Sequence, residues 1–251
     1  MERPFDAVRR ALANDGGDRS TPVRLDPTRQ FRSGVPEIIL GGVKTPEEVA
    51  ASLAALASAN GRALATRLFP GQIDIITAKL ADSFDLHPHP LARALVAAAR
   101  GAQPPVGAGR VGVITAGSSD APIAAEAALV ASEMGAAIHE VSDVGVSGLH
   151  RLVEPLERLI AADVDVIIVV AGMDGALPSV VAGLVAVPVI GLPTSTGYGY
   201  GGQGVAALMS MLQSCAPGLV VVNIDNGVGA GSTAALIANR AGAGRVARGR
   251  S

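Results

Sequence analysis

The stretch VGVITAGSSDAPIAAEAA, residues 111–128, decides the fold of the larger part of the chain. Its start, Val111–Thr115, predicts a buried strand, and Ala116–Ser119 predicts a tight loop of small residues. A helix follows, opened by Asp120 as a capping residue and by Pro122 in its first turn, because proline is preorganised for a helix start. Such a helix N-terminus presents free backbone N–H groups to an anion. The stretch predicts a binding site for a phosphate or carboxylate group, or else a plain strand-to-helix turn.

The same strand–loop–helix pattern recurs from this stretch to the end of the chain. The apolar runs that predict strands are Val111–Thr115, Ala137–Val141, Val164–Val170, Val187–Leu192 and Leu219–Ile224, and the helices between and after them are Pro122–Met134, Ser147–Ala161, Gly175–Ala186, Gly204–Ser214 and Gly231–Ala241. Strands that are nearly continuous Val and Ile are buried on both faces, which is typical of a parallel sheet covered by helices. We therefore predict an α/β fold with a doubly wound parallel sheet in flavodoxin-like order.

The first part of the chain has a different pattern and predicts a smaller α+β domain. We place this domain at residues 1–105 and the α/β domain at 106–251, because the segment 101–109 is rich in Gly, Ala and Pro. Thr45-Pro46-Glu47-Glu48 has the pattern of a capping box and predicts a helix that runs to about Ala59. The other elements expected here are strands at Glu37–Leu40 and Ala63–Phe69, and helices at Phe5–Ala13 and Leu86–Arg100.

Composition excludes several classes of function. The 251 residues are 49% hydrophobic and 17% charged, with a formal net charge of −2, so there is no basic excess for binding nucleic acid or an anionic membrane. No apolar run reaches the roughly 18 residues of a membrane span, and the start lacks a signal-peptide core, so we expect a cytoplasmic protein. One cysteine excludes an intrachain disulfide and a cysteine-based zinc site. The 2% of aromatic residues argues against base-stacking platforms and aromatic cages.

Polar residues gather in the loops that follow the predicted strands of the α/β domain. Ligands of doubly wound sheets bind outside the carboxyl ends of the strands, where these loops lie. Each residue alone is explained as a cap or a turn, but their joint placement at one edge predicts a site. In chain order they are Ser118, Ser119 and Asp120; Asp143, His150 and Arg151; Met173 and Asp174; Thr194, Ser195 and Tyr198; and Asp225 and Asn226.

Cys215 does not fit this edge. It ends the helix before the fifth strand, and that helix returns from the carboxyl edge, so Cys215 is expected at the opposite edge of the sheet. Two interpretations follow: the residue is inert core, or it enters the site of a neighbouring subunit. A helix C-terminus disfavours a thiolate, so a reactive Cys215 needs positive charge, which a cationic substrate supplies.

Two family resemblances rest on longer motifs. GSSD (117–120), HR (150–151), AGMDGALPSVVAG (171–183) and PVIGLP (188–193) resemble the phosphoribosylaminoimidazole carboxylase (PurE) class. FRSGVPEIILGGVKTPEE (31–48), SDVGVSGLHRL (142–152), AGMDGALPSVVAGL (171–184), PTSTGYGYGG (193–202), LQSCAPG (212–218) and NIDNGVGA (223–230) resemble the LarB family, the pyridinium-3,5-biscarboxylic acid mononucleotide synthases of nickel-pincer cofactor biosynthesis. The second resemblance covers nearly the whole chain.

The LarB resemblance implies a reaction and an assembly. The family carboxylates nicotinic acid adenine dinucleotide at the pyridinium C5 with CO2 and cleaves the phosphoanhydride, releasing AMP. Its catalytic cysteine matches Cys215, and an acidic residue that is Glu in most members matches Asp174. The PurE class forms octamers with sites at subunit contacts, so we expect a homo-oligomer, either an octamer or at least a dimer. The segment YGYGGQG (198–204) departs from the family pattern, and no role is assigned to it.

The expected chemistry distributes roles among the residues named above. A thiolate that adds at C6 of the ring makes C5 nucleophilic toward CO2, and expulsion of sulfur restores aromaticity. Asp174, Asp143 and His150 are the alternatives for the base that takes the C5 proton. We expect Ser118, Ser119 and Asp120 to hold a phosphate, Thr194 and Ser195 to lie at the substrate, and Asp225 and Asn226 to contact ribose hydroxyls or a metal. Hydrolysis of a phosphoanhydride often recruits Mg²⁺, and no organic cofactor is predicted.

Two other functions stay open at this point. One is an aminoimidazole ribonucleotide carboxylase or mutase, against which stand the extra N-terminal region and Cys215. The other is a non-catalytic nucleotide-binding module, since fold does not fix function. Turnover of nicotinic acid adenine dinucleotide with bicarbonate separates the three.

Overall fold

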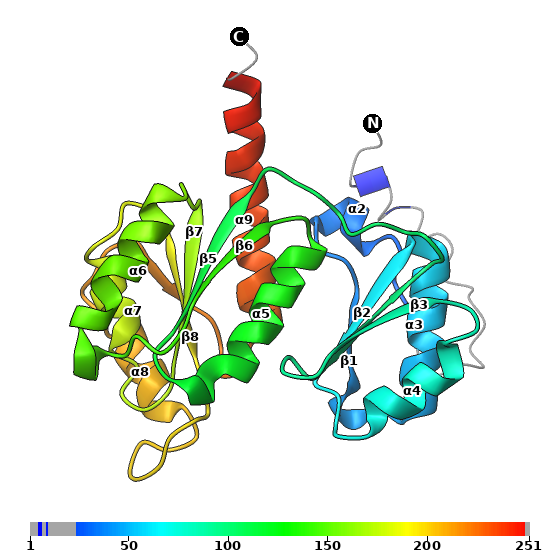
Figure 1. Cartoon of the computed structure of the whole chain (residues 1–251), viewed down its shortest axis with the longest axis horizontal. Helices are drawn as coiled ribbons and strands as arrows, with labels where there is room; N and C mark the ends of the chain where they lie inside the picture. Colours follow the sequence, from blue (N-terminus) through cyan, green and yellow to red (C-terminus); the bar gives the residue numbers. More distant parts are fainter. Residues whose placement is uncertain (1–4, 7–8, 10–23, 249–251) are drawn as a thin grey trace. The chain divides into compact units, whose positions relative to one another are not determined.

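The computed structural model describes residues 5, 6, 9 and 24–248 and divides them into two compact units (Figure 1). The N-terminal unit holds the described residues up to Pro90 together with Ala94–Gln103, and the C-terminal unit holds Leu91–Arg93 and the described residues from Pro104 onward. The division after Gln103 lies inside the segment 101–109 that the sequence offers as a boundary. The helix expected at Phe5–Ala13 lies mostly outside the described residues.

The C-terminal unit is built on a parallel sheet of five strands. These are β5 (Arg110–Thr115), β6 (Ala137–Val141), β7 (Val166–Ala171), β8 (Val189–Pro193) and β9 (Leu219–Val221). Their order is β6-β5-β7-β8-β9, and each neighbouring pair is parallel. This order confirms the predicted doubly wound, flavodoxin-like sheet. The central strands are the predicted Val and Ile runs, and they are buried on both faces of the sheet.

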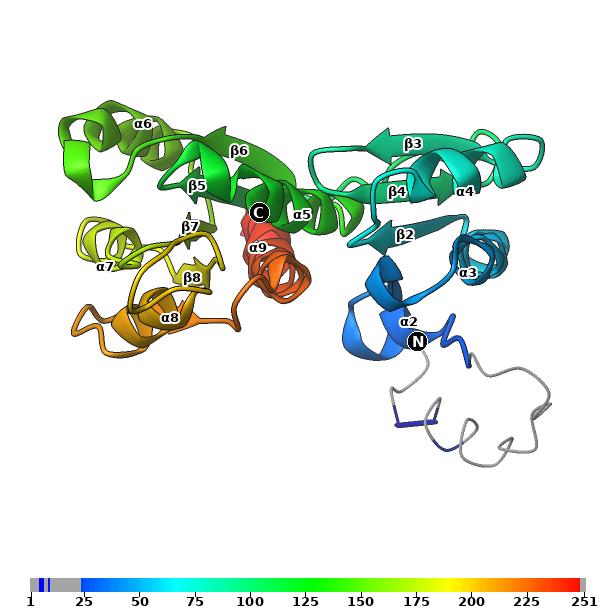
Figure 2. The same cartoon turned by 90° about the horizontal axis from the view of Figure 1, so that it is seen from below.

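Helices cover both faces of this sheet (Figure 2). The helices are α5 (Ala121–Glu133), α6 (His150–Ala161), α7 (Leu177–Ala182), α8 (Val205–Leu212) and α9 (Gly227–Arg248). Helices α5 and α9 pack together on one face, while α6, α7 and α8 cover the other with a core that includes Leu156, Val181 and Met211. The helix α9 begins earlier than predicted because the Asn226 side chain caps it, accepting a hydrogen bond from the Gly229 N–H at 2.9 Å.

The N-terminal unit has a four-stranded mixed sheet. The strands β1 (Ile38–Leu40), β2 (Arg62–Thr66), β3 (Asp85–His89) and β4 (Ala94–Ala98) are arranged in the order β1-β2-β4-β3. The helices are α2 (Arg29–Ser33), α3 (Pro46–Asn60) and α4 (Gln72–Leu80), with a 3-10 turn at Gly41–Val43. Helices α3 and α4 bury Leu53 and Ile76 against the sheet, and these residues form the core of this unit.

The predicted helix at Leu86–Arg100 is wrong. This segment forms the antiparallel pair of β3 and β4, with Leu86 opposite Ala97 and Pro88 opposite Leu95. Pro88 and Pro90 disfavour the interior of a helix, and β3 is an edge strand, where proline is tolerated. The alanine-rich β4 is fully buried between its neighbours, so tertiary burial overrides its helical propensity.

The predicted start of α3 is confirmed in detail. The Thr45 hydroxyl accepts a hydrogen bond from the Glu48 N–H, and the Glu48 carboxylate accepts one from the Thr45 N–H at 2.8 Å, which completes a capping box. The helix α4, which the sequence analysis did not predict, follows a glycine in left-handed conformation, Gly71. Over the described part of the chain, no helix is long and apolar enough to cross a membrane.

Candidate functional site

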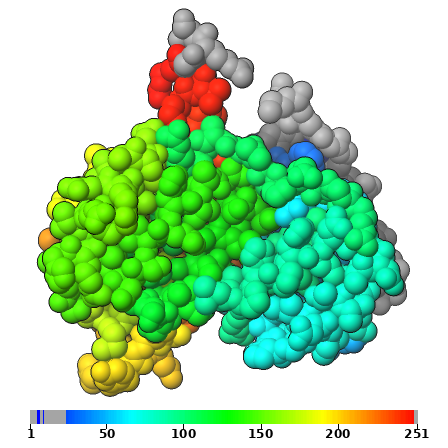
Figure 3. Space-filling view, viewed as in Figure 1, coloured from blue at the N-terminus to red at the C-terminus, as the bar shows by residue number. Residues whose placement is uncertain are grey.

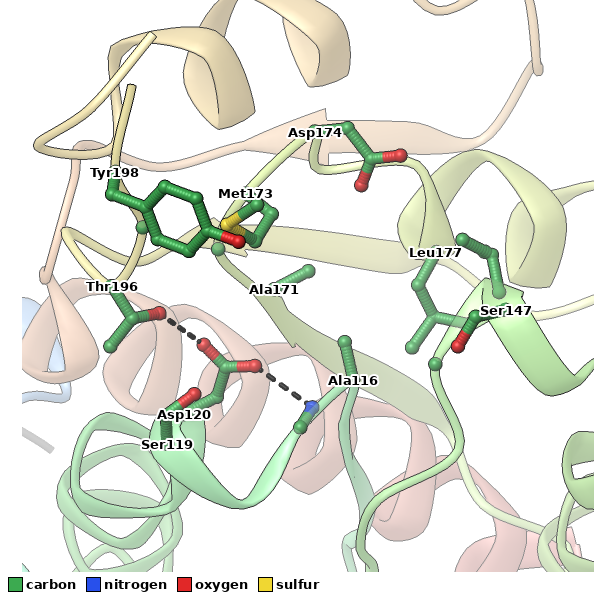
Figure 4. Close-up of a pocket in the computed structure, with 15 residues that line it drawn as sticks. Ala116, Ser119, Asp120, Ser147, Ala171, Met173, Asp174, Leu177, Thr196 and Tyr198 are labelled. Atoms are coloured by element: carbon green, nitrogen blue, oxygen red, sulfur yellow. Dashed lines mark hydrogen bonds between the residues drawn. The ribbon is translucent and has the colours of Figure 1, made fainter.

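A pocket of ≈ 740 Å³ opens at the carboxyl ends of the strands in the C-terminal unit (Figure 4). Four loops line it, and they follow β5, β6, β7 and β8. Its lining residues are Ala116, Gly117, Ser119, Asp120, Gly145, Val146, Ser147, Ala171, Gly172, Met173, Asp174, Leu177, Thr196, Gly197 and Tyr198. The position agrees with the rule for ligand sites in doubly wound sheets. Ser147 and Thr196 were not predicted from the sequence, although both lie in the loops at this edge.

Asp120 ties the loop after β5 to the loop after β8. Its side chain is buried, and one carboxylate oxygen accepts the Gly117 N–H at 3.0 Å. The other oxygen accepts the hydroxyls of Thr194 and Thr196, each at 2.7 Å. Figure 4 draws the bonds to Thr196 and to the backbone nitrogen. A carboxylate that accepts three protein donors holds these loops together, and most of its hydrogen-bonding capacity is used within the protein.

The expected cap of α5 is therefore corrected. Asp120 already has helical dihedral angles because a 3-10 turn, Ser118–Asp120, precedes the helix, and its carboxylate turns back to Gly117. The N–H of Gly117 is taken by this bond. Ser118 and Ser119 are exposed beside the helix N-terminus, and of the two only Ser119 is among the lining residues.

The loops after β7 and β8 are in tight contact. A Cβ on Gly172 would lie 2.2 Å from both the carbonyl oxygen and the hydroxyl oxygen of Thr196, so only glycine fits there. The Met173 N–H donates to the Thr196 carbonyl at 3.1 Å. Thr196 thus has its backbone held by one loop and its hydroxyl held by Asp120.

Asp174 is the exposed carboxylate of the pocket. It stands between Met173 and Gly175, which have φ angles of 51° and 61°, so a tight turn presents its side chain outward. Its nearest backbone donor is the Ala176 N–H, at 3.5 Å. At that length the bond is weak, so the carboxylate is open to a ligand donor.

Asp143 and His150, the other predicted bases, are not among the lining residues. Asp143 forms an exposed ion pair with Arg151, 3.1 Å between the guanidinium and the carboxylate. Its backbone N–H donates to the Thr115 hydroxyl at 3.1 Å. His150 is exposed at the start of α6. Of the three predicted bases, the structure brings Asp174 alone into the pocket wall.

The remaining predicted binding residues hold the loops in place. Thr194 is fully buried and bonded to Asp120. The Ser195 N–H donates to the Asp225 carboxylate at 2.8 Å, which joins the loop after β8 to the loop after β9. Asn226 caps α9, as described above. The pocket lining includes none of Thr194, Ser195, Asp225 and Asn226.

Cys215 is exposed and lies just before β9. Leu219 at the start of β9 pairs with Val189 at the start of β8, so Cys215 stands at the amino edge of the sheet, while the pocket lies at the carboxyl edge. Within one chain the Cys215 side chain is thus not part of the core. Nearby, the hydroxyls of Ser179 and Ser214 hydrogen bond at 2.7 Å and join α7 to the end of α8.

Comparison with known proteins assigns both units to families. The model of AIR carboxylase matches residues 110–246, and the model of the LarB/PurE-like N-terminal domain matches residues 19–99. The uncharacterized protein MJ0165 of Methanocaldococcus jannaschii is 44% identical over 218 residues, which cover 86% of this chain and 84% of that protein.

Two enzymes are similar to the C-terminal unit. The N5-carboxyaminoimidazole ribonucleotide mutase of Methanocaldococcus jannaschii is 33% identical over 127 residues, 50% of this chain and 74% of the enzyme. The mutase of the same name from Pyrococcus abyssi is 33% identical over 138 residues, 53% of this chain and 73% of the enzyme.

Proposed function

The chain belongs to the LarB family, with a PurE-like C-terminal domain, and from that premise we propose that it carboxylates the pyridinium C5 of nicotinic acid adenine dinucleotide. The same enzyme hydrolyses the phosphoanhydride, so the products are pyridinium-3,5-biscarboxylic acid mononucleotide and AMP. The observation that carries the proposal is the joint match of both domain models to one chain. The PurE-like domain supports a carboxylase-type activity, and the N-terminal domain separates this chain from a simple mutase.

The proposed carboxylation proceeds in three steps. A thiolate adds to C6 of the pyridinium, which breaks the aromaticity and leaves C5 as an enamine carbon. C5 attacks CO2 and forms a carbon–carbon bond. A base then takes the proton from C5, and the C–S electron pair leaves with sulfur, which restores both the aromatic ring and the thiolate. Water cleaves the phosphoanhydride separately.

Asp174 is our choice for the base. It is the exposed carboxylate of the pocket, and its loop already presents it to the cavity. Asp143 is paired with Arg151, and His150 lies outside the lining. The hydroxyls of Ser118 and Ser119 beside the N-terminus of α5 suit the phosphate of the mononucleotide half.

In this proposal the thiol comes from another subunit. Cys215 and the pocket lie at opposite edges of one sheet, so a single chain cannot bring them together without unfolding. We therefore propose a homo-oligomer, of the octamer type, in which Cys215 of one copy enters the pocket of the next. The exposed apolar side chains of Val205, Met209 and Leu212 on α8, close in sequence to Cys215, offer a surface for such a contact.

We also propose Mg²⁺ as a counter-ion of the substrate phosphates. Among the described residues, no group of three or more His, Cys, Asp and Glu side chains is arranged to hold a metal. Such a cation would take its ligands from phosphate and water. The ion would neutralise charge at the phosphoanhydride.

Subunit complementation tests the proposal. Cys215→Ala and Asp174→Asn are each expected to lack carboxylation of nicotinic acid adenine dinucleotide with bicarbonate. Co-expressed with different affinity tags and purified through both, the two variants form mixed assemblies in which about a quarter of the sites combine an intact Asp174 with an intact Cys215. Recovery of activity near that fraction supports the shared site. Mixed assemblies that stay inactive, although each variant binds substrate, contradict it.

The mutase activity is the second function to be assayed, because the curated mutases resemble the C-terminal unit. The same preparation is offered aminoimidazole ribonucleotide with bicarbonate, and N5-carboxyaminoimidazole ribonucleotide. Turnover of either compound that Cys215→Ala leaves intact would replace the proposal with this alternative.

A further inference from the structure

The loop from Gly197 to Gly204 carries both tyrosines of a chain that has no tryptophan. Tyr198 is 84% exposed, and Tyr200 is fully exposed. The loop projects from the C-terminal unit, in yellow in Figure 3. Glycines at positions 197, 199 and 204 have positive φ angles, as does Gln203. Aromatic rings that project into water on such a loop can stack on a flat ligand.

Both ends of this loop are held by neighbouring segments of the C-terminal unit. At one end, Thr196 is bonded to Asp120 and to Met173. At the other end, Gly204 is buried, and a Cβ there would lie 2.8 Å from the Thr194 carbonyl. The loop is therefore held at both ends, and of its two tyrosines Tyr198 lines the pocket.

Tyr198 belongs to the electron-rich end of the pocket. Figure 4 shows its ring beside Met173, and Asp174 follows next in the chain. The Met173 sulfur lies close to the backbone of Gly197, since a Cβ there would be 3.4 Å from it. An aromatic face, a thioether and a carboxylate all favour a positive partner.

The charge of the pocket points the same way. Of the described residues that line it, none is Lys, Arg or His, whereas Asp174 is exposed there. The anion-binding serines lie at the N-terminus of α5, on another loop. A ligand with a phosphate at one end and a flat cationic ring at the other matches both ends.

We infer that Tyr198 is a specificity-determining residue: the π face of its ring recognises the positive charge of the ligand's heteroaromatic ring. This rests on the proposed function, because that function supplies the cationic ring. The tyrosine ring stacks on the ring of the ligand, and the neutral form of the same ring is bound more weakly. Tyr200 lies outside the pocket lining and does not take part.

Calorimetric titration of the full-length protein tests this with two ligands that differ in ring charge. Nicotinamide mononucleotide has a cationic ring, and its dihydro form has the same phosphate and ribose with a neutral ring. The wild type is expected to bind the oxidised form more tightly. Tyr198→Leu should weaken that binding about 5- to 30-fold and leave the dihydro form within about twofold. Tyr198→Phe keeps the π face and should retain the preference, and Tyr200→Leu serves as the matched control.

Two results overturn the inference. One is a Tyr198→Leu protein that binds both ring forms as the wild type does. The other is an equal loss for both forms, which would mean that the tyrosine only supports the loop. In Tyr200→Phe, all tyrosine emission comes from Tyr198, so quenching by the oxidised ligand reports the stacking directly.

Turnover separates this inference from the proposed function. Charge-selective binding without carboxylation of nicotinic acid adenine dinucleotide would refute the function and keep the inference. Carboxylation that Tyr198→Leu leaves unchanged in KM and kcat, with no charge preference in binding, would do the reverse.

Discussion

Removal of the Asp120 carboxylate should destabilise the C-terminal unit more than any exposed substitution in the same loop. The buried carboxylate accepts the Gly117 N–H and the hydroxyls of Thr194 and Thr196. A hydrogen bond to a charged group contributes about 1.5–3 kcal/mol, and Asp120→Ala leaves all three donors without this acceptor. The mutual contact of the two threonine hydroxyls survives, and a carboxylate no longer has to be buried. We expect a net loss of about 3–5 kcal/mol.

Asp120→Asn should cost much less, about 1 kcal/mol. The amide oxygen can accept the Gly117 N–H while its NH2 group donates to the two threonine hydroxyls, which rotate to accept. The shape is kept and only the charge is lost. A large gap between the Ala and Asn variants is therefore the specific signature of a hydrogen-bonded clamp.

Urea unfolding followed by circular dichroism, together with calorimetry, measures the effect. At about 2–4 °C per kcal/mol for a unit of this size, Asp120→Ala should lower the Tm of the C-terminal unit by roughly 10 °C. The exposed neighbour Ser119→Ala, within about 0.5 kcal/mol, is the control. Because the groups form one network, Asp120→Ala and Thr194→Val should be non-additive in a double-mutant cycle. Additive losses, or an Ala variant as stable as the Asn variant, would refute the reasoning.

Three further predictions concern other parts of the chain. Arg245→Met should destabilise the C-terminal unit by about 2–3 kcal/mol in urea unfolding, because the buried Asp165 carboxylate, 2.6 Å from that guanidinium, loses its charge partner; an unchanged midpoint would contradict this. The Gly101 N–H and the Arg100 guanidinium hold the pKa of Asp85 below its usual value of 3.8, so its ionised form stabilises the N-terminal unit above that pH, and the contribution is lost as the pH falls through the lowered pKa. The stability gap between wild type and Asp85→Asn should accordingly shrink as the pH is lowered from about 5 to 2, and a gap that widens toward acid would be the opposite sign. Thr45→Ala should cost about 1 kcal/mol through loss of the capping box, whereas Thr45→Ser should stay near wild type in the same unfolding assay.

Much of the C-terminal unit could be predicted because its signals are local and agree with one another. Apolar runs such as Val166–Ala171 are buried on both faces, so their composition alone indicates a parallel sheet. The fold of the N-terminal unit was harder to predict from the sequence. Ala94–Ala98 is rich in alanine and reads as helical, and the sheet around it, which no local pattern encodes, makes it a strand.

The sequence predicted the edge of the sheet at which the site lies, but not the role of each polar residue there. The rule for doubly wound sheets places the pocket where it lies, and Asp174 and Ser119 line it. Asp120, Thr194 and Asn226 are polar residues in the expected loops, but they bond to the protein. Whether a polar side chain faces a ligand or a neighbouring loop depends on three-dimensional partners as far away as Thr196 from Asp120, and sequence spacing does not contain them.

The prolines of β3 have a consequence for how copies of this chain can associate. A sheet grows by adding another strand to an open edge, and each incoming strand needs backbone donors along that edge. Pro88, with Pro90 just beyond the strand end, lacks the N–H that such an extension uses, so the edge at β3 is a poor template for polymerisation. At high concentration the protein should stay free of fibrils seeded from this edge.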